Sequence, residues 1–255
     1  MSGHTKPKMK RMRIYFDGCS KTGGYSLSGR VDRRYPKLLC EKFNAEEYNI
    51  AQRSGSNKRL VRNLLEHDLS KFDLFVIQMT KRKRLEYYDK KSKGWVSIGY
   101  RNTTLPPKIT GLSHDIPIDY VEMRDENERD VSFHTIWRGD VISLNDVRRL
   151  GRGTDKEVYK INEVSTDKKN LIKYYLHYYR NVYTEEQGKI DEQMCFSTMK
   201  SILKNYKHII IYMHSDNKTY VPVDLQYKKG KDYESGWYMG ADTHKIILDD
   251  ILRLL

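Results

Sequence analysis

Residues 13–24 read Arg-Ile-Tyr-Phe-Asp-Gly-Cys-Ser-Lys-Thr-Gly-Gly. Ile14, Tyr15 and Phe16 have high strand propensity, and the glycines that follow allow the backbone to turn sharply. The stretch therefore predicts a short buried strand that ends in a turn carrying Ser20. In open α/β sheets ligands bind outside the carboxyl ends of the strands, so Ser20 would lie where a ligand can reach it.

Apolar patterns beyond this turn alternate between helical spacing and strand-length runs. Helices are predicted at residues 35–43 and 57–65, from residue 168 onward and at the C-terminus, and strands at residues 47–51, 72–77 and 208–213. A break in the helical region is expected near Gly188. This order predicts an α/β fold of three layers, α/β/α, with a mostly parallel central sheet.

The middle of the chain, residues 81–167, is rich in charges and lacks sustained periodicity. We expect residues 13–255 to form one α/β domain in which this stretch is an insertion or lid. The basic run at residues 81–84 is followed by aromatic residues such as Tyr87 and Trp95. This combination leaves an alternative open, a basic groove that binds single-stranded nucleic acid.

The composition limits the partners and the compartment. The 255 residues carry a formal net charge of +13, which favours nucleic acid or other polyanions as partners, and residues 1–12 are expected to be a solvated basic tail. The three cysteines lack the spacing of a zinc ribbon or a disulfide framework, which favours a reducing compartment. No apolar run approaches the ~20 residues of a membrane span and no signal-peptide pattern is present, so we expect a cytoplasmic protein.

Ser20 has candidate catalytic partners near the C-terminus. A serine hydroxyl needs a base within hydrogen-bond reach and a third group that orients the base. Asp242 and His244 precede the predicted terminal helix, and in a doubly wound sheet this position can share an edge with Ser20. We expect His244 to take the Ser20 proton and Asp242 to stabilise the imidazolium.

Other polar residues follow predicted strands at the same edge. Acyl transfer needs hydrogen-bond donors aimed at the developing oxyanion, and the candidates are the Ser20 amide, the Gly55 amide and the side chains of Asn57 and Gln78. Three further residues are expected to contact the substrate, namely Thr22, Thr80 and Arg84.

Competing residues offer a different chemistry. His214 and Asp216 follow the strand at 208–213 and could act together as a general base and the carboxylate that orients it. Such residues more commonly lie in a solvated turn without a catalytic role. Cys19 could act as a thiol nucleophile, and His177 lies on a Tyr-rich helix where packing or exposure is the ordinary role. No His, Cys, Asp or Glu spacing is typical of a metal site, and no cofactor is expected.

These residues resemble three sequence blocks of the SGNH or GDSL hydrolases. Residues 18–22 resemble the first block, in which a serine follows the first strand. Residues 49–57 resemble the second block, whose glycine helps to form the oxyanion hole, and residues 242–244 resemble the last, where aspartate and histidine complete the triad. The resemblance implies a flavodoxin-like fold and a serine ester hydrolase or acyltransferase acting on an acylated carbohydrate or another polar ester.

The chain also departs from the family pattern. Cys19 stands where the family has aspartate, the Gly-x-Asn-Asp block is absent, and one residue instead of two separates Asp242 from His244. Residues 75–80, followed by Arg84, resemble a variant found in SGNH-like proteins of phages and large DNA viruses, which implies a host cytoplasm or a virion. An enzyme is therefore the first hypothesis, and a catalytically degenerate structural or nucleic-acid-binding protein is the second.

Overall fold

The computed structural model describes residues 10–25, 27, 31–91, 93–105, 116–125, 131–137, 140–143, 166–213, 220–227 and 240–255. Contacts divide the chain into two compact units. The first holds residues 1–52, 60–79 and 198–255, and the second holds residues 53–59 and 80–197. Each unit has its own β-sheet.

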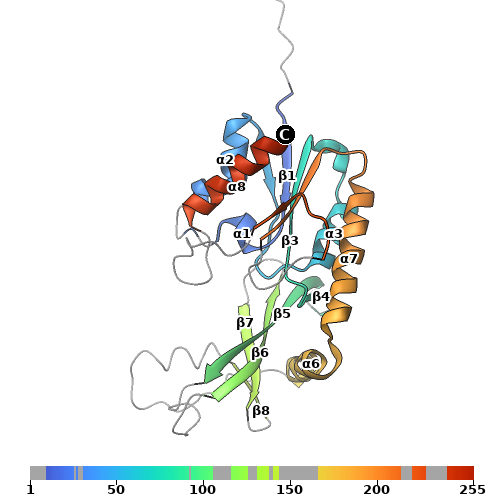
Figure 1. Cartoon of the computed structure of the whole chain (residues 1–255). Coiled ribbons are helices and arrows are strands. Elements are labelled where there is room, and N and C mark those ends of the chain that lie inside the picture. The colour runs from blue at the N-terminus through green and yellow to red at the C-terminus, as the bar shows by residue number, and fades with distance from the viewer. Residues whose placement is uncertain are drawn as a thin grey trace, which may run out of the picture. The chain divides into compact units, whose positions relative to one another are not determined.

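The first unit contains a five-stranded sheet in which all neighbouring strands are parallel (Figure 1). Its order is β2 (Glu46–Asn49), β1 (Arg13–Asp17), β3 (Leu74–Met79), β9 (His208–Tyr212) and β10 (Leu225–Gln226). The chain runs from β1 outward to β2 and then returns to the other side of β1 with β3. The strand order therefore reverses between β1 and β3, and ligands of such sheets bind at the carboxyl ends of the strands at this point.

Helices cover both faces of this sheet. On one face, alternate apolar residues of β1, β3 and β9 pack with α2 (Tyr35–Lys42) and α8 (Ala241–Leu254). On the opposite face lies α3 (Asn57–Glu66), whose Asn63 donates a hydrogen bond to Asp17 at the end of β1. Short helical turns complete the unit, namely α1 (Ser20–Gly23), η1 (Val31–Arg33) and η2 (Leu69–Lys71). The predicted three-layer α/β/α fold with a parallel central sheet is confirmed.

The second unit contains a five-stranded antiparallel sheet that the sequence did not predict. Its strands follow chain order as β4 (Arg84–Asp89), β5 (Gly94–Leu105), β6 (Ile116–Asp125), β7 (Val131–Trp137) and β8 (Asp140–Ser143). One face packs on α6 (Thr166–His177), which continues into a π-helical turn, η3 (Tyr178–Val182). The long helix α7 (Glu185–Ile202) follows, and residue 198 begins the part of it that belongs to the first unit. The stretch 81–167, predicted as an insertion, thus lies in a unit that also includes residues 168–197.

Two helix ends differ from the prediction. The helical region is interrupted at residues 183–184, and Gly188 itself lies inside α7, where a Cβ would collide with the Tyr183 hydroxyl. The terminal helix begins at Ala241, so Asp242 and His244 lie inside α8 and not ahead of it. None of the described helices is both long and apolar enough to cross a bilayer.

Candidate active site

Ser20 is the first residue of α1 and lies at the carboxyl end of β1. Cys19 before it has an extended backbone, with φ −112° and ψ −164°, and its carbonyl accepts the Gly23 amide at 3.1 Å. Gly24 ends the turn in the left-handed region, with φ 73°, where glycine has no steric penalty. The Ser20 side chain is partly exposed, and it makes no side-chain hydrogen bond within the described part of the chain. Its hydroxyl is therefore available to a ligand.

Gln78, near the end of β3, forms hydrogen bonds with residues of the turn that carries Ser20. Its Oε1 accepts hydrogen bonds from the Thr22 hydroxyl at 2.6 Å and from the Cys19 amide at 3.3 Å. Its Nε2 donates to the Cys19 Sγ at 3.1 Å and to the Met79 carbonyl at 3.5 Å. Both Gln78 and Thr22 are fully buried. These contacts give the two side chains a positioning role, and their roles as oxyanion donor and substrate contact stay predictions.

Gly18 allows the turn to approach Gln78 this closely. A Cβ at Gly18 would lie 2.7 Å from the Cβ of Gln78 and 2.6 Å from the Thr22 hydroxyl. Such contacts are well inside van der Waals distance, so a larger residue would push the turn away from β3. The glycine is thus required by packing beneath Ser20.

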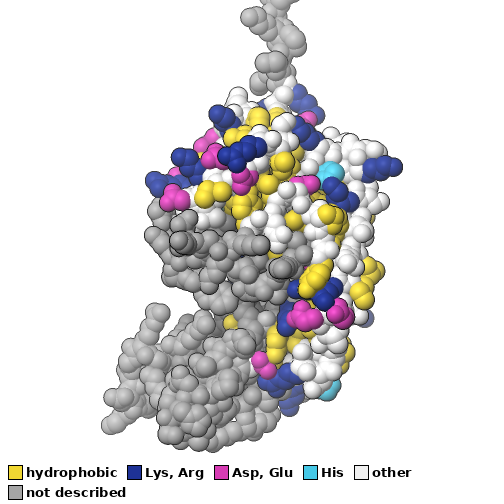
Figure 2. Space-filling view, viewed as in Figure 1, with side chains coloured by type: hydrophobic (Ala, Val, Ile, Leu, Met, Phe, Trp, Pro, Cys, Tyr) yellow, Lys and Arg dark blue, Asp and Glu magenta, His cyan; other side chains and the backbone are white. Residues whose placement is uncertain are grey.

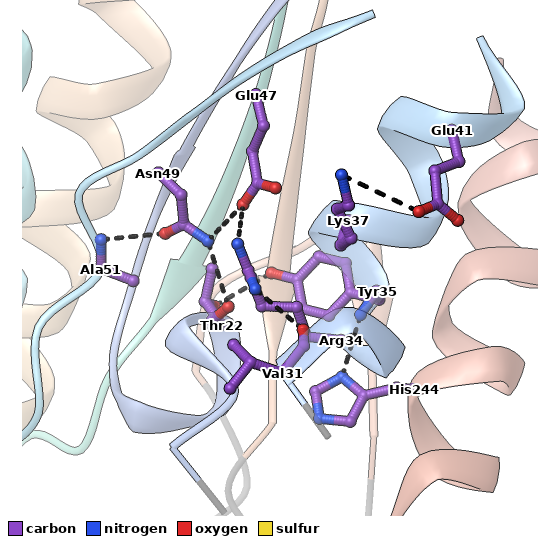
Figure 3. A network of polar contacts seen from close by, with 10 residues as sticks. All are labelled: Thr22, Val31, Arg34, Tyr35, Lys37, Glu41, Glu47, Asn49, Ala51 and His244. Carbon is purple, nitrogen blue, oxygen red and sulfur yellow. Dashed lines mark hydrogen bonds and ion pairs between the residues drawn. The ribbon is translucent and has the colours of Figure 1, made fainter. Parts of the chain in front are cut away.

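A series of side-chain contacts connects Gln78 to His244 through Thr22 and Tyr35. The Thr22 hydroxyl lies 2.9 Å from the Tyr35 hydroxyl, and the Tyr35 ring stacks on the imidazole of His244 with centroids 5.9 Å apart (Figure 3). The Tyr35 amide, at the start of α2, donates to Nδ1 of His244 at 3.2 Å. This amide would otherwise be an unsatisfied donor at a helix N-terminus. His244 therefore joins the first turn of α8 to the first turn of α2.

The environment of His244 keeps its ring neutral. The pKa of the imidazole is lowered from 6.5 to about 4, mainly by burial and in smaller part by the positive charges of Arg34 and Lys21. Because Nδ1 accepts the Tyr35 amide, the proton of the neutral ring lies on Nε2. That nitrogen is buried, and it has no hydrogen-bond partner in the described part of the structure. The charge of Lys21, the residue after Ser20, thus acts on His244.

Asp242 is separated from the imidazole by the geometry of the helix. Its side chain is exposed in the first turn of α8, two positions before the buried His244. Residues two apart on a helix do not face each other, and an acidic side chain in the first turn is favourable beside the positive end of the helix dipole. The structure therefore gives Asp242 a helix-stabilising position, and its catalytic role stays a prediction.

The far side of the turn is held by charged and amide groups of β2. Arg34 pairs with Glu47 at 2.8 Å, and Asn49 donates to the same carboxylate at 3.0 Å and to the Thr22 carbonyl at 3.3 Å (Figure 3). The Asn49 side chain also accepts the Ala51 amide at 3.1 Å. These contacts fix the segment after β2 against the segment that carries Ser20. The Arg34–Glu47 pair has no sequence signature, because thirteen residues separate its partners.

The remaining predicted residues belong to the second unit. Asn57 forms a three-bond clamp with Thr80, whose amide and hydroxyl reach its Oδ1 at 2.7 and 3.2 Å and whose carbonyl accepts from its Nδ2 at 3.2 Å. Arg84 donates to the Gly55 carbonyl at 3.4 Å. Asn57 and Thr80 are both buried. Their geometry describes a structural clamp, and their predicted roles in oxyanion and substrate binding stay predictions.

The competing residues are placed as follows. His214 and Asp216 lie outside the described residues. The Cys19 thiol is buried against Gln78, and the exposed His177 contacts Asn181 at the end of α6. Within the described residues, no three His, Cys, Asp or Glu side chains gather as metal ligands would.

No protein-family model and no curated protein matches this chain. Among solved structures, it matches a carbohydrate esterase at 14% identity, covering 96% of this chain and 69% of that chain, with a TM-score of 0.42. A protein described as lipolytic and of the G-D-S-L family, from Desulfitobacterium hafniense DCB-2, matches at 13% identity, 96% and 100% coverage and TM-score 0.36. A family two carbohydrate esterase from Clostridium thermocellum, in complex with cellohexaose, matches at 12% identity, 97% and 64% coverage and TM-score 0.36. Likeness at this level carries no argument about the activity of this chain.

Proposed function

We propose that this chain is a serine ester hydrolase or acyltransferase of the SGNH type in which Ser20 is the nucleophile. The observation that carries the proposal is the position of Ser20 at the carboxyl end of β1, where the strand order reverses. Gln78 holds the turn while the hydroxyl stays accessible. The substrate in this proposal is an acylated carbohydrate or another polar ester.

The proposed reaction passes through an acyl-serine intermediate. The Ser20 oxygen attacks the ester carbonyl carbon, and its proton passes to the imidazole of His244. Amide N–H groups of the turn, the Ser20 amide first among them, stabilise the oxyanion. The intermediate collapses, the alcohol leaves with the proton of the imidazolium, and the acyl group stays on Ser20. Water, or an acceptor hydroxyl in a transferase, then attacks this ester by the same steps.

His244 can act as a general base only if it gives up the hydrogen bond that it accepts from the Tyr35 amide. A general base must present a free lone pair to the serine hydroxyl, whereas the present contact places the proton on Nε2. The ring must therefore release the Tyr35 amide during catalysis. Burial and the charges of Arg34 and Lys21 keep the ring neutral at pH 7 and disfavour its protonated form, so the proposed base role also requires the ring to leave this environment.

A second candidate function is ligand binding without turnover, and the same side chains favour it. Asp242 is exposed two positions before the buried His244, while Nδ1 of His244 accepts the amide of Tyr35 in α2. A chain that keeps the fold but not the triad would bind a polar ligand at the carboxyl edge of the sheet. In this second proposal the chain is similar to SGNH-like proteins of phages and large DNA viruses, and it is located in the cytoplasm or in a virion.

Ester hydrolysis by matched serine variants distinguishes the two candidates. Hydrolysis of short-chain p-nitrophenyl esters is measured for wild type, for Ser20→Ala and for Ser201→Ala, which removes an exposed serine of α7. We expect Ser20→Ala to lose at least about a thousandfold in kcat/KM, as other serine hydrolases do when they lose the nucleophile. Ser201→Ala should match wild type. Equal rates in all three proteins would exclude the hydrolase and leave the binding protein.

A further inference from the structure

The hairpin of β4 and β5 in the second unit presents three lysines at its turn. Lys90, Lys91 and Lys93 are exposed, and they form no ion pair within the described residues. The acidic neighbour in the turn is Asp89, whose Oδ1 accepts the Lys91 amide at 3.1 Å. The carboxylate thus shapes the turn, and the lysine ammonium groups extend into solvent.

The backbone of this turn contains a residue in an unfavourable conformation. Lys93 has φ 52°, in the left-handed region where a side chain with a Cβ meets a steric cost that glycine does not. Among the described residues other than glycine, Asn44 and Ser54 share this conformation, and glycine at position 93 would remove its steric cost.

An aromatic pair lies at the base of the same turn. Tyr88 and Trp95 are opposite each other in the register of β4 and β5, and their rings form an edge-to-face pair with centroids 5.5 Å apart. Tyr88 is 48% exposed although it is a large aromatic residue. A lysine cluster and an exposed aromatic ring therefore belong to the same hairpin.

The basic run at residues 81–84 differs from the hairpin lysines because it includes cations that pair with acidic residues. Arg82 is buried and lies 3.5 Å from Glu185 and 4.0 Å from Glu192, and Lys83 pairs with Glu185 at 3.0 Å. These cations are matched by acidic residues of α7 inside the second unit. The stretch that first suggests polyanion binding in the sequence is thus structural, and the unmatched positive charge lies eight residues further on.

We propose that the β4–β5 hairpin binds single-stranded nucleic acid. The three lysines would contact phosphates, and an unpaired base would stack on the Tyr88 ring. Stacking needs a base whose π-face is free, which a single strand offers and a duplex does not. The net charge of +13 favours the encounter with any polyanion, and the aromatic pair adds the preference for exposed bases. This site is independent of Ser20.

The test measures binding of a labelled oligothymidylate to the full chain by fluorescence anisotropy, between about 50 and about 200 mM salt. One variant combines Lys90→Gln, Lys91→Gln and Lys93→Gln. Its control, with the same change of charge, combines Lys42→Gln, Lys71→Gln and Lys204→Gln, which are exposed lysines of the first unit. The slope of log affinity against log salt should fall by about 2 in the hairpin variant, since each phosphate contact on a single strand contributes about 0.7. The control should keep the wild-type slope.

Two single variants separate charge, stacking and folding. Tyr88→Leu should weaken binding at least about fivefold with an unchanged salt slope, because stacking is not electrostatic. Lys93→Gly should lower the slope while its melting temperature stays at or above that of wild type, because glycine accepts the left-handed backbone. The proposal is overturned if wild type does not bind, if the two triple variants behave alike, or if duplex DNA or a sulfated glycan binds as tightly as the oligothymidylate.

Discussion

At the scale of single residues, the position of Ser20 depends on Gln78. Replacing Gln78 with Ala leaves the buried Cys19 amide without its side-chain acceptor and opens a cavity beneath the turn. We expect Gln78→Ala to lower the free energy of unfolding by about 3 kcal/mol. Urea unfolding followed by circular dichroism measures this change.

The matched control is Gln226→Ala, which removes an exposed glutamine from the edge strand β10. Surface substitutions of this kind change the free energy of unfolding by about 0.5 kcal/mol or less. Similar losses in both variants would show that Gln78 does not anchor the Ser20 turn.

His244 predicts a pH dependence of stability. Its pKa is about 4 in the folded chain and 6.5 without the fold, so the unfolded chain binds the proton first as pH falls. Stability from this residue is therefore complete above pH 6.5 and is lost between about pH 6.5 and about pH 4, by about 3 kcal/mol in all. Urea unfolding across this range should show the loss in wild type and not in His244→Gln. A difference between the two proteins that does not change with pH would contradict the assignment.

Individual site residues differ in how far the sequence predicts their positions. Ser20 was identifiable because a strand and glycines surround it. The contact between His244 and the Tyr35 amide was not, because a backbone N–H has no sequence signature and 209 positions separate the two residues. The sequence marks Gln78 and Thr22 only as polar residues near the ends of predicted strands, and their packing reveals that both are fully buried.

At the scale of elements, the clamp between Asn57 and Thr80 joins the start of α3 to the residue after β3. Asn57→Ala would leave the buried amide and carbonyl of Thr80 without the partners that Asn57 supplies. We expect a loss of about 2 kcal/mol or more in unfolding free energy, measured by thermal unfolding. Asn170→Ala, on an exposed position of α6, is the control and should cause no loss. An unchanged melting temperature in Asn57→Ala would show that the clamp is not needed.

The parallel and the antiparallel elements differed in how well the sequence predicted them. The central strands β1, β3 and β9 of the first sheet are buried and contain continuous apolar runs, such as Phe75 to Ile77 in β3. In β5 the residues alternate, with Val96 and Ile98 facing α6. This two-residue period was a usable signal, but the lysines and tyrosines around it obscured the pattern.

At the scale of the whole molecule, the alternation of strands and helices was enough to predict the α/β fold, because each parallel strand needs a crossover helix. The same alternation did not predict the second unit, in whose sheet each strand pairs with the strand that follows it in the chain. The net charge of +13 also says little about where the charge lies. On the face in Figure 2, positive and negative side chains are interspersed over the described surface. Within α2, for example, Lys37 pairs with Glu41.

The central claim is that Ser20 is a reactive nucleophile at the carboxyl edge of the parallel sheet. Labelling of the full chain with a fluorophosphonate probe, followed by peptide mapping, tests it directly. The claim predicts one covalent adduct on Ser20, which is lost in Ser20→Ala and kept in Ser201→Ala. No adduct on wild type, or an adduct on another serine that persists in Ser20→Ala, would contradict it.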